Sequence, residues 1–583
     1  MLRITIRLLL MLTVAATLAI ITSCGAAPMG DGEDGDDKGN GEKQPVAIRI
    51  PSSDTFGRDV VKFDSIVYSR PDTDVLVAGL LAARDGIIDN SIPYDEQLGA
   101  VIELEDEYTD FLTMYAYANI QNYRNSADEV YSAEFAHLSE KYAEIVDAIE
   151  ELMVAAAGSP HAESFESEYF GEGLIEKYSD GESLSDKVVA LMKAEAELEA
   201  RYTATKHGKL AEMKEIYLEL LRVRRMIADE MGYDSYRDYA YEQNGYSYAP
   251  SEVLDLITEI SKYAAPVYQK LSKRVFTNYF KKNAAAELDT GVLVNTLADV
   301  YEGLDEDFAD VYSYMLHFGL FDISNAEEGR FAGAFTTYLN GYESPYLFVT
   351  SNGTMADYLT LSHEFGHFTD FFKNGDTDVQ LDLTEVYSQS MTMLTLLALE
   401  ERMSAKDYQY LFYTQLEEML LTLVFQGYYA RFEHIVYELE YGDISEVNVN
   451  RAAMQAAAEM SLPSYYYGTM NALMIPHLFV QPFYVESYCT SLTAAMQIFF
   501  AEYENDGDGL TLYNALLDRE HGSSLTENLE RVNMDSPFKS GLIYEMVDKI
   551  HYLVLGAPYF DESANDSVYL DPRMICSPRK SAA

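Results

Sequence analysis

Two long stretches of the 583-residue chain repeat apolar residues every three or four positions, and this spacing constrains the fold more than any other feature. The stretches cover residues 126–158 and 208–232, and each ends near a glycine. Such spacing places apolar side chains on one face of an α-helix, and glycine commonly ends a helix. From about residue 55 to 303 the pattern is nearly all helical, with a break predicted at residues 158–173. The sequence therefore predicts a mainly α fold.

The pattern changes between residues 329 and 350, where Phe, Tyr and Thr are interrupted by turn residues. Aromatic and β-branched residues between turns indicate strands, so a small sheet of two or three strands is predicted here. Helical spacing returns at Met355 and continues to about Leu555. Residues 556–583 have weak periodicity and are predicted to form a C-terminal tail.

The chain is strongly acidic, with 96 Asp and Glu against 41 Lys and Arg, which gives a net charge of −55. A surface of this sign repels nucleic-acid phosphates and anionic membrane surfaces, so neither is an expected ligand. The hydrophobic content of 48% is sufficient for a real core, which excludes a disordered protein.

The N-terminus has the features of a secretory signal. Arg3 and Arg7 flank the start of an apolar run, and small residues precede Cys24 in "ITSC", which is similar to a bacterial lipobox. A lipobox cysteine is lipidated and anchors the protein, whereas a plain signal peptide with a chance cysteine is the alternative. Residues 25–48 are rich in Gly, Asp and Glu and are predicted to be a flexible acidic linker.

The sequence "TLSHEFGHFT" (360–369) places His363 and His367 four residues apart, on one face of a predicted helix. Two imidazoles at this spacing can bind one zinc ion. Glu364 is rotated away from the pair, which suits it to take a proton from a water molecule that the metal acidifies. Thr354 is predicted to cap the helix and Gly375 to end it. The alternative is a surface pair of histidines with no metal.

A catalytic zinc site also needs a third protein ligand. The next predicted helix, "LDLTEVYSQSMTMLTLLALEERM" (381–403), offers Asp382 and Glu385 in its first turn. Glu385 is the candidate ligand, and its alternative role is to complete a capping box with Asp382. The spacing leaves both roles open.

The strings "LTLSHEFGHFTDFF" and "TEVYSQSM" together resemble the thimet oligopeptidase and oligoendopeptidase F family of zinc metallopeptidases. Three further segments resemble that family in the expected order, from about residue 200 to 555: "MIADEMGYDSYRDYAYEQNGYSYAPSEV", "MIPHLFVQPFYVESYCTSLTAA" and "HGSSLTENLERVNMDSP". The resemblance implies one zinc ion held by His363, His367 and Glu385, with Glu364 as the general base.

The resemblance also implies donors for the oxyanion that forms when a peptide carbonyl is attacked. The matching positions are His477, Tyr484 and Tyr488, each of which could instead be an ordinary core residue. The strand residues Gly333, Ala334 and Phe335 are candidates for pairing with the substrate backbone.

Three features depart from the family pattern. The interval between His363 and Glu385 is several residues shorter than usual, and Thr392 stands where many members have an acidic residue. These two departures concern the support of the ligands more than the ligands themselves. The tyrosine run also lies about one residue further from His477 than in some members, and this departure concerns the match of Tyr484.

The resemblance implies a large helical, two-lobed metallopeptidase with a deep central channel and a small β-sheet next to the histidine helix. The predicted domains are a signal peptide (1–24), a linker (25–48), an N-terminal helical domain (49–200), a catalytic domain (201–555) and a tail (556–583). The expected substrates are short unfolded peptides. The protein itself is expected outside the cell, in contact with the membrane only through a lipid at Cys24. The competing hypotheses are a catalytically impaired peptide-binding lipoprotein of the same fold, which Thr392 favours, and a structural surface lipoprotein.

Overall fold

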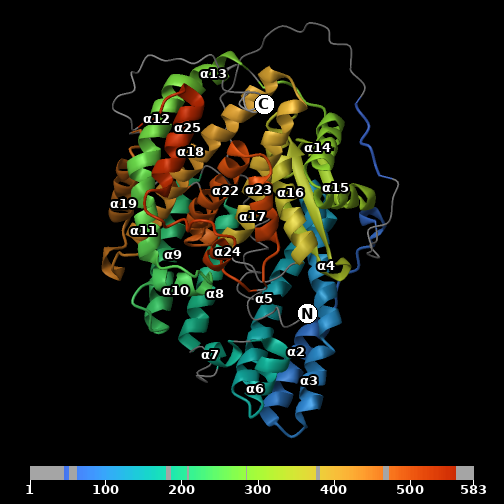
Figure 1. The fold of residues 1–583 in the computed structure, drawn as a ribbon. Coiled ribbons are helices and arrows are strands. Elements are labelled where there is room, and N and C mark those ends of the chain that lie inside the picture. The colour runs from blue at the N-terminus through green and yellow to red at the C-terminus, as the bar shows by residue number, and fades with distance from the viewer. Residues whose placement is uncertain are drawn as a thin grey trace. The chain divides into compact units, whose positions relative to one another are not determined.

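The computed structural model describes residues 45–51, 62–171, 173–178, 186–205, 209–283, 285–375, 381–463, 472–473, 475–520 and 522–559 (Figure 1). The described elements fall into two compact units, one from residues 1–183 and 287–378 and the other from residues 184–286 and 379–583. Helices make up most of both, which confirms the mainly α fold. Among the helices of the described residues, none combines the length and apolarity needed to cross a membrane.

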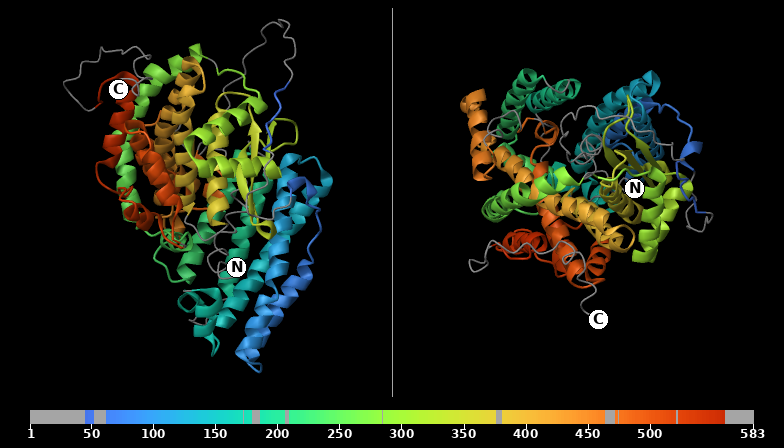
Figure 2. Two further views of the ribbon diagram at one scale, coloured as in Figure 1. Left: turned by 45° about the vertical axis from the view of Figure 1, so that its right-hand side comes forward. Right: turned by 90° about the horizontal axis from the view of Figure 1, so that it is seen from above.

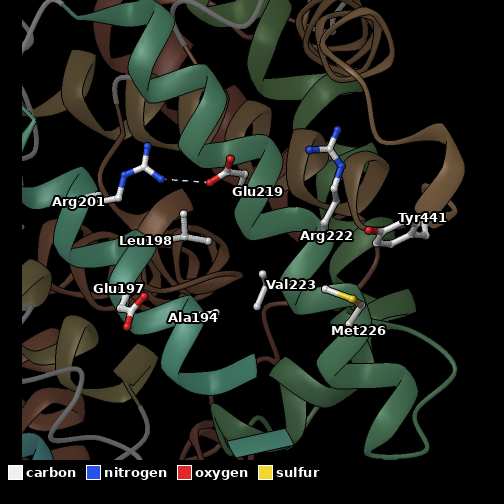
Figure 3. Close-up of a pocket in the computed structure, with 9 residues that line it drawn as sticks. All are labelled: Ala194, Glu197, Leu198, Arg201, Glu219, Arg222, Val223, Met226 and Tyr441. Atoms are coloured by element: carbon white, nitrogen blue, oxygen red, sulfur yellow. Dashed lines mark hydrogen bonds and ion pairs between the residues drawn. The ribbon is translucent and has the colours of Figure 1, made fainter. Parts of the chain in front are cut away.

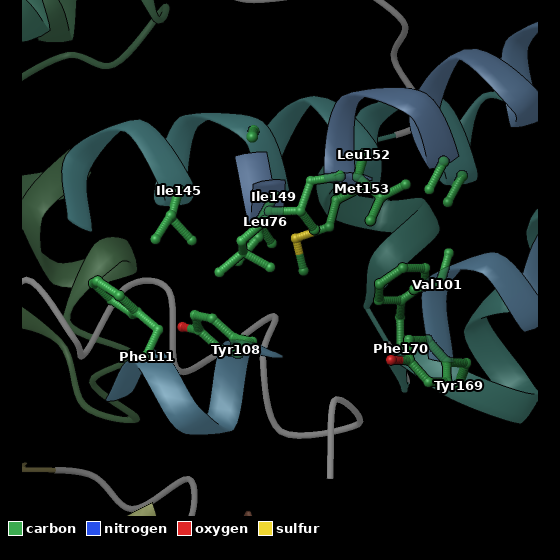
Figure 4. Close-up of a cluster of buried hydrophobic side chains, with 14 of the residues drawn as sticks. Leu76, Val101, Tyr108, Phe111, Ile145, Ile149, Leu152, Met153, Tyr169 and Phe170 are labelled. Atoms are coloured by element: carbon green, nitrogen blue, oxygen red, sulfur yellow. The ribbon is translucent and has the colours of Figure 1, made fainter. Parts of the chain in front are cut away.

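The first unit begins with a set of amphipathic helices: α2 (Thr73–Asp89), α3 (Tyr94–Ile102), α4 (Glu105–Arg124), α5 (Glu129–Ala157), α6 (Ala162–Phe165) and α7 (Leu174–Tyr178). The long helix α5 packs against α2 and α4. Apolar residues from these helices, including Leu76, Phe111, Ile149 and Leu152, form a buried cluster (Figure 4). Asp128 caps α5 by accepting the backbone N–H of Val130, which fixes where this helix begins.

The second half of the first unit has two helices, α14 (Thr290–Leu304) and α15 (Glu306–Phe318), followed by a three-stranded sheet. The strands β1 (Phe321–Asn325), β2 (Ala334–Leu339) and β3 (Ser344–Ser351) lie in the order β1-β3-β2. β3 is buried along its whole length. It runs parallel to β1 and antiparallel to β2, and Phe348 of β3 pairs with Phe335 of β2. Helix α16 (Asp357–Asn374) packs on β2 and β3.

The sheet lies where the sequence predicts it, with one difference. β2 and β3 fall within residues 329–350, extended by Ser351, but β1 lies earlier in the chain. β1 is short and has two exposed residues at its end, so it lacks the alternation that signals a strand. Its pairing with β3 depends on the tertiary fold rather than on its own pattern.

The second unit contains only helices and turns among the described residues. It comprises α8 (Asp186–Ala204), α9 (Leu210–Glu230), α10 (Tyr236–Gln243), α11 (Pro250–Glu259), α12 (Ala265–Leu271), α13 (Thr277–Lys282), α17 (Leu381–Ala398), α18 (Ala405–Val436), α19 (Glu446–Glu459), α21 (His477–Val480), α22 (Ser487–Glu504), α23 (Asp508–Leu517), α24 (Leu525–Arg531) and α25 (Leu542–Leu555). α17 packs against α22, and α18 contacts both α19 and α22. Two further views show that the strands gather in one place while helices make up the rest (Figure 2).

The predicted helices at residues 126–158 and 208–232 are confirmed as α5 and α9. The break predicted at residues 158–173 is only partly open chain, because it contains α6 and the π-helical turn η3 (Glu166–Phe170). The signal peptide (1–24) with Cys24 lies outside the described residues, as do nearly all of the linker and the tail. The predicted boundary between residues 200 and 201 stays a prediction.

Candidate metal centre

Helix α16, which carries the histidine pair, is held at its N-terminus by the carboxylate of Asp357. This carboxylate accepts the hydroxyl of Ser351 at 2.7 Å and the backbone N–H groups of Asn352 and Thr354, both at 3.1 Å. The prediction that the side chain of Thr354 caps the helix is wrong, because Ala356 occupies the N-cap and Thr354 bonds through its backbone. Gly375 ends the helix at a φ of 73°, as predicted.

His363 and His367 lie one turn apart on α16, with ring centroids 5.1 Å apart and ring planes at 81°. Burial lowers the pKa of His363 to about 4 and, together with the neighbouring His363, lowers the pKa of His367 well below its usual range. Both rings are therefore neutral near pH 7. A neutral imidazole has the lone pair that a metal ligand needs.

Glu364 is buried next to His363, with 1% of its surface exposed. Its carboxylate Oε2 lies 3.0 Å from the hydroxyl of Thr336 on β2, and its backbone carbonyl oxygen lies 2.9 Å from the same hydroxyl. One hydroxyl of the sheet thus reaches both the side chain and the backbone of Glu364. This contact restrains the carboxylate to a small set of positions.

Glu385 lies inside α17 and is almost fully buried. Its Oε2 accepts the hydroxyl of Ser388 at 3.0 Å, and its Oε1 accepts the hydroxyl of Tyr484 at 3.3 Å. Burial raises the pKa of Glu385 to about 7, and these two hydrogen bonds act in the opposite direction. Asp382 is also within the helix and buried, so it is not the N-cap that the capping-box alternative requires.

Thr392, which departs from the family pattern, lies one turn after Ser388 on α17. Its hydroxyl donates to the backbone carbonyl oxygen of Ser388 at 3.0 Å. The support of Glu385 on its own helix therefore comes from the Ser388 hydroxyl, and Thr392 adds no charge to it.

Among the described residues, the side chains that could hold a metal ion are His363, His367 and Glu385. Each offers one ligand atom, and these atoms all lie within 4.8 Å of one another. Two neutral imidazoles and one carboxylate are a donor set that zinc accepts, with a further position left for water or substrate. The chemistry of the three residues fits the metal that the sequence predicts.

His477, Tyr484 and Tyr488 form a compact buried cluster in the second unit. The rings of His477 and Tyr484 stack with centroids 4.8 Å apart and planes at 4°. The hydroxyl of Tyr488 lies 3.4 Å from Nε2 of His477. Burial lowers the pKa of His477 to about 3, so its ring is neutral and has one N–H to donate. The three side chains predicted as donors are thus brought together.

Ala334 and Phe335 begin β2, which is at the edge of the sheet, and Gly333 directly precedes this strand. The carbonyl oxygen of Gly333 accepts the N–H of Thr350, and Phe335 stacks on Phe348 at 4.9 Å. A side chain at Gly333 would meet the ring of Phe331, since an added Cβ would lie 2.5 Å from it. Substrate pairing by these residues stays a prediction.

A separate groove of about 400 Å³ lies on the second unit between α8 and α9 (Figure 3). It is lined by residues that include Leu198, Arg222 and Met226, and an ion pair between Arg201 and Glu219 lies beside them. None of its lining residues is a candidate for the metal centre. Cys489 is a buried free cysteine, and Cys576 lies outside the described residues.

The sequence pattern does not predict Thr336, nor Arg224 and Glu433, whose side chains bond the backbone of Leu478 and Phe483. The only local signal for Thr336 is its place in "AFTTYL", where alternation puts Thr336 and Thr337 on opposite faces of the strand. That pattern does not tell which of the two threonines faces α16.

Comparison with known proteins identifies a peptidase family. Residues 310–548 match peptidase family M3, and residues 63–179 match the peptidase M3 N-terminal domain. An oligoendopeptidase F homologue of Borreliella burgdorferi is 28% identical over 203 residues, which are 32% of this chain and 33% of the relative. The aligned part thus spans about a third of the relative's length.

Solved structures share the fold at low sequence identity. PZ peptidase A, solved with an inhibitor, has a TM-score of 0.72 and 21% identity, over 84% of this chain and 98% of its own. A Bacillus anthracis protein assigned as an oligoendopeptidase F has a TM-score of 0.67 and 22% identity, over 84% and 97% respectively. At these identities the likeness establishes the fold.

Proposed function

Because this chain belongs to peptidase family M3, we propose that it is a zinc-dependent metalloendopeptidase that hydrolyses short, unfolded peptides outside the cell. The observation that carries the proposal is the group formed by His363, His367 and Glu385, whose ligand atoms lie within 4.8 Å of one another. Glu364, beside the first of them, is buried and restrained by Thr336.

The two histidines have the protonation state that metal binding needs, because burial lowers the pKa of both rings. Burial raises the pKa of Glu385 to about 7, and a cation bound beside this carboxylate would favour its ionised form. When bound, a zinc ion acts as a Lewis acid that polarises a peptide carbonyl and lowers the pKa of a water molecule.

Glu364 is the proposed general base. It takes a proton from the attacking water and then delivers it to the nitrogen of the leaving amine. Its carboxylate is not one of the three metal ligands, and the Thr336 hydroxyl holds it in place.

His477 and Tyr488 are the proposed donors to the oxyanion, while the hydroxyl of Tyr484, the third residue of the cluster, donates to Glu385 and is proposed to hold that ligand in place. The neutral imidazole and the Tyr488 hydroxyl are already in contact at 3.4 Å, which supports a shared role. Donors aimed at the developing charge are effective where water is excluded, and all three side chains are buried.

We place the enzyme outside the cell, anchored through a lipid at Cys24 or secreted. The sequence supports this location through the apolar N-terminal run and the "ITSC" motif. The strong negative charge of the chain repels nucleic-acid phosphates, so peptides are the more suitable partners.

Hydrolysis of a quenched fluorescent peptide of about eight residues tests the proposal. We expect the wild-type protein to cleave it, lose activity when a chelator removes the metal, and regain activity when zinc is added back. Tight peptide binding and bound zinc without cleavage would favour the impaired binding protein instead. Cleavage that survives complete metal removal would refute the zinc mechanism.

A further inference from the structure

The segment that carries His477, Tyr484 and Tyr488 has a strained backbone at Phe483. It consists of the short helix α21, a bend, the 3₁₀ turn η10 (Tyr484–Glu486) and the start of α22. Phe483 lies in the bend with φ 64° and ψ 6°, a left-handed conformation that a bulky residue avoids. Such a conformation persists only where the surroundings enforce it.

Arg224 of α9 holds the first part of this segment. Its side chain is fully buried, and its guanidinium donates to the backbone carbonyl oxygens of Leu478, at 3.2 Å, and Phe479. These carbonyls belong to α21, directly after His477. Both lie more than 250 residues from Arg224 in the chain. A planar guanidinium that bonds two successive carbonyls fixes their direction as well as their distance.

The charge of Arg224 is balanced by two carboxylates of α8. Nε lies 2.6 Å from Glu195 and Nη2 lies 3.0 Å from Glu199, while Nη1 also donates to the hydroxyl of Tyr437 at 2.9 Å. A buried charge is costly to keep, and in some proteins its benefit is that it specifies one arrangement of the backbone. In this chain the part whose position Arg224 would specify is α21, because the guanidinium bonds two backbone carbonyl oxygens of that helix.

Glu433 of α18 holds the strained bend itself. Its Oε1 accepts the backbone N–H of Phe483 at 3.0 Å. The carbonyl oxygen of Phe483 accepts the hydroxyl of Tyr246 at 3.1 Å, and that of Pro482 accepts the amide of Asn244 at 3.1 Å. The bend is thus fixed on both sides of the strained residue.

We propose that Arg224 and Glu433 are positioning residues, which hold the backbone of residues 477–483 so that His477, Tyr484 and Tyr488 keep the single arrangement needed to stabilise the oxyanion. This inference rests on the proposed function. Neither residue needs to touch substrate: Arg224 acts through the carbonyls after His477, and Glu433 acts through the amide before Tyr484. A displacement of about 1 Å in such donors can lower a rate about 100-fold.

The first test replaces Arg224 with lysine. Lysine keeps the positive charge beside Glu195 and Glu199 but cannot bond two carbonyls as a planar fork. We expect kcat to fall 10- to 100-fold for the octapeptide, with KM within about threefold of wild type and zinc content unchanged. The matched control is Arg222→Lys on the same helix, whose guanidinium bonds the carbonyl oxygen of Ile444 and not the segment.

The second test compares two substitutions of Glu433. Glu433→Gln keeps an oxygen that can accept the N–H of Phe483, and Glu433→Met removes it while keeping the length of the side chain. We expect the glutamine variant to retain most of the wild-type kcat and the methionine variant to lose it as Arg224→Lys does. Rescue by glutamine separates the hydrogen bond from the charge.

Hydrogen exchange measured by mass spectrometry provides a readout that does not need catalysis. Amides of residues 475–490 should exchange faster in Arg224→Lys and Glu433→Met than in wild type, while amides of α17 and α22 beyond residue 492 stay protected. Faster local exchange together with reduced kcat supports the proposal. Wild-type kcat in both variants, or unchanged exchange in the segment, overturns it.

A wild-type protein that cleaves no peptide would refute the proposed function. In that case hydrogen exchange alone decides whether Arg224 and Glu433 hold the segment, and unchanged exchange would reject the positioning role as well.

Discussion

The hydroxyl of Thr336 lies 3.0 Å from Oε2 of Glu364, so a strand of the small sheet touches the carboxylate that we propose as the general base. Thr336 is on β2 and Glu364 is on α16, which packs on that strand. The same hydroxyl lies 2.9 Å from the backbone carbonyl oxygen of Glu364. The sheet therefore does more than cover the helix: it sets the position of a carboxylate.

Replacing Thr336 with valine is expected to lower kcat about tenfold. Valine keeps the shape but loses the hydrogen bond to a charged group, and such bonds contribute about 1.5–3 kcal/mol. Steady-state hydrolysis of the octapeptide measures the effect. Thr336→Ser should keep most of the activity, and Thr337→Val, on the other face of the strand, is the control. Equal rates for the two valine variants would show that Thr336 does not position Glu364.

Replacing Glu385 with glutamine is expected to reduce zinc retention at least tenfold. Glutamine can still bond Ser388 and Tyr484, but it removes the negative charge and is a poor zinc ligand. Zinc per protein after dialysis against a weak chelator measures the loss. Asp382→Asn, a buried carboxylate on the same helix, is the matched control. Unchanged zinc content in Glu385→Gln would exclude Glu385 as a ligand.

Replacing Tyr488 with phenylalanine is expected to lower kcat about 100-fold and to leave zinc content unchanged. The change removes the hydroxyl that lies 3.4 Å from His477 and is proposed to donate to the oxyanion. Loss of one such donor typically costs about 100- to 1,000-fold. Tyr387→Phe is the control, since its hydroxyl donates to the carbonyl oxygen of Leu516 instead. An effect on KM alone would argue for a role in substrate binding.

The pH dependence of stability should reflect the buried His477. Burial lowers its pKa to about 3 in the folded protein, while the unfolded chain has the usual value near 6.5. Between these values the unfolded state binds the extra proton, so the free energy of unfolding falls as the pH falls from about 6.5 towards 3. The contribution of this group approaches about 1.4 kcal/mol per pH unit.

Urea unfolding at pH 7 and pH 5 measures this contribution. His477→Gln, which does not titrate, should lose less stability between the two pH values than wild type does. The same loss in both proteins would mean that His477 does not titrate as its burial indicates.

The local part of the metal centre is predictable from sequence. His363 and His367 share a helix face because the helical period fixes that relation, and Glu364 is placed by the same geometry. Glu385 required the family resemblance, because its spacing alone also permitted a capping role. The structure weakens that alternative by placing Asp382 within the helix.

The supporting residues are not predictable in the same way. Thr336 reaches Glu364 through the packing of a strand on a helix, and Arg224 reaches Leu478 across 254 positions of the chain. Neither helical periodicity nor motif spacing predicts contacts between residues so far apart in the sequence. Pro482 signals a turn, and the backbone N–H of Tyr484 bonds the carbonyl oxygen of Gln481 across it. The residue type of Phe483 does not predict its left-handed conformation, for which Gly or Asn is the expected residue.

The most direct test of the central claim compares wild-type protein with Glu364→Gln, both loaded with zinc. Glutamine has the size of glutamate and can still accept the Thr336 hydroxyl, but it cannot take a proton. We predict that kcat for the octapeptide falls about 100- to 10,000-fold while zinc content and unfolding free energy stay close to wild type. Hydrolysis at the wild-type rate by Glu364→Gln would contradict the account.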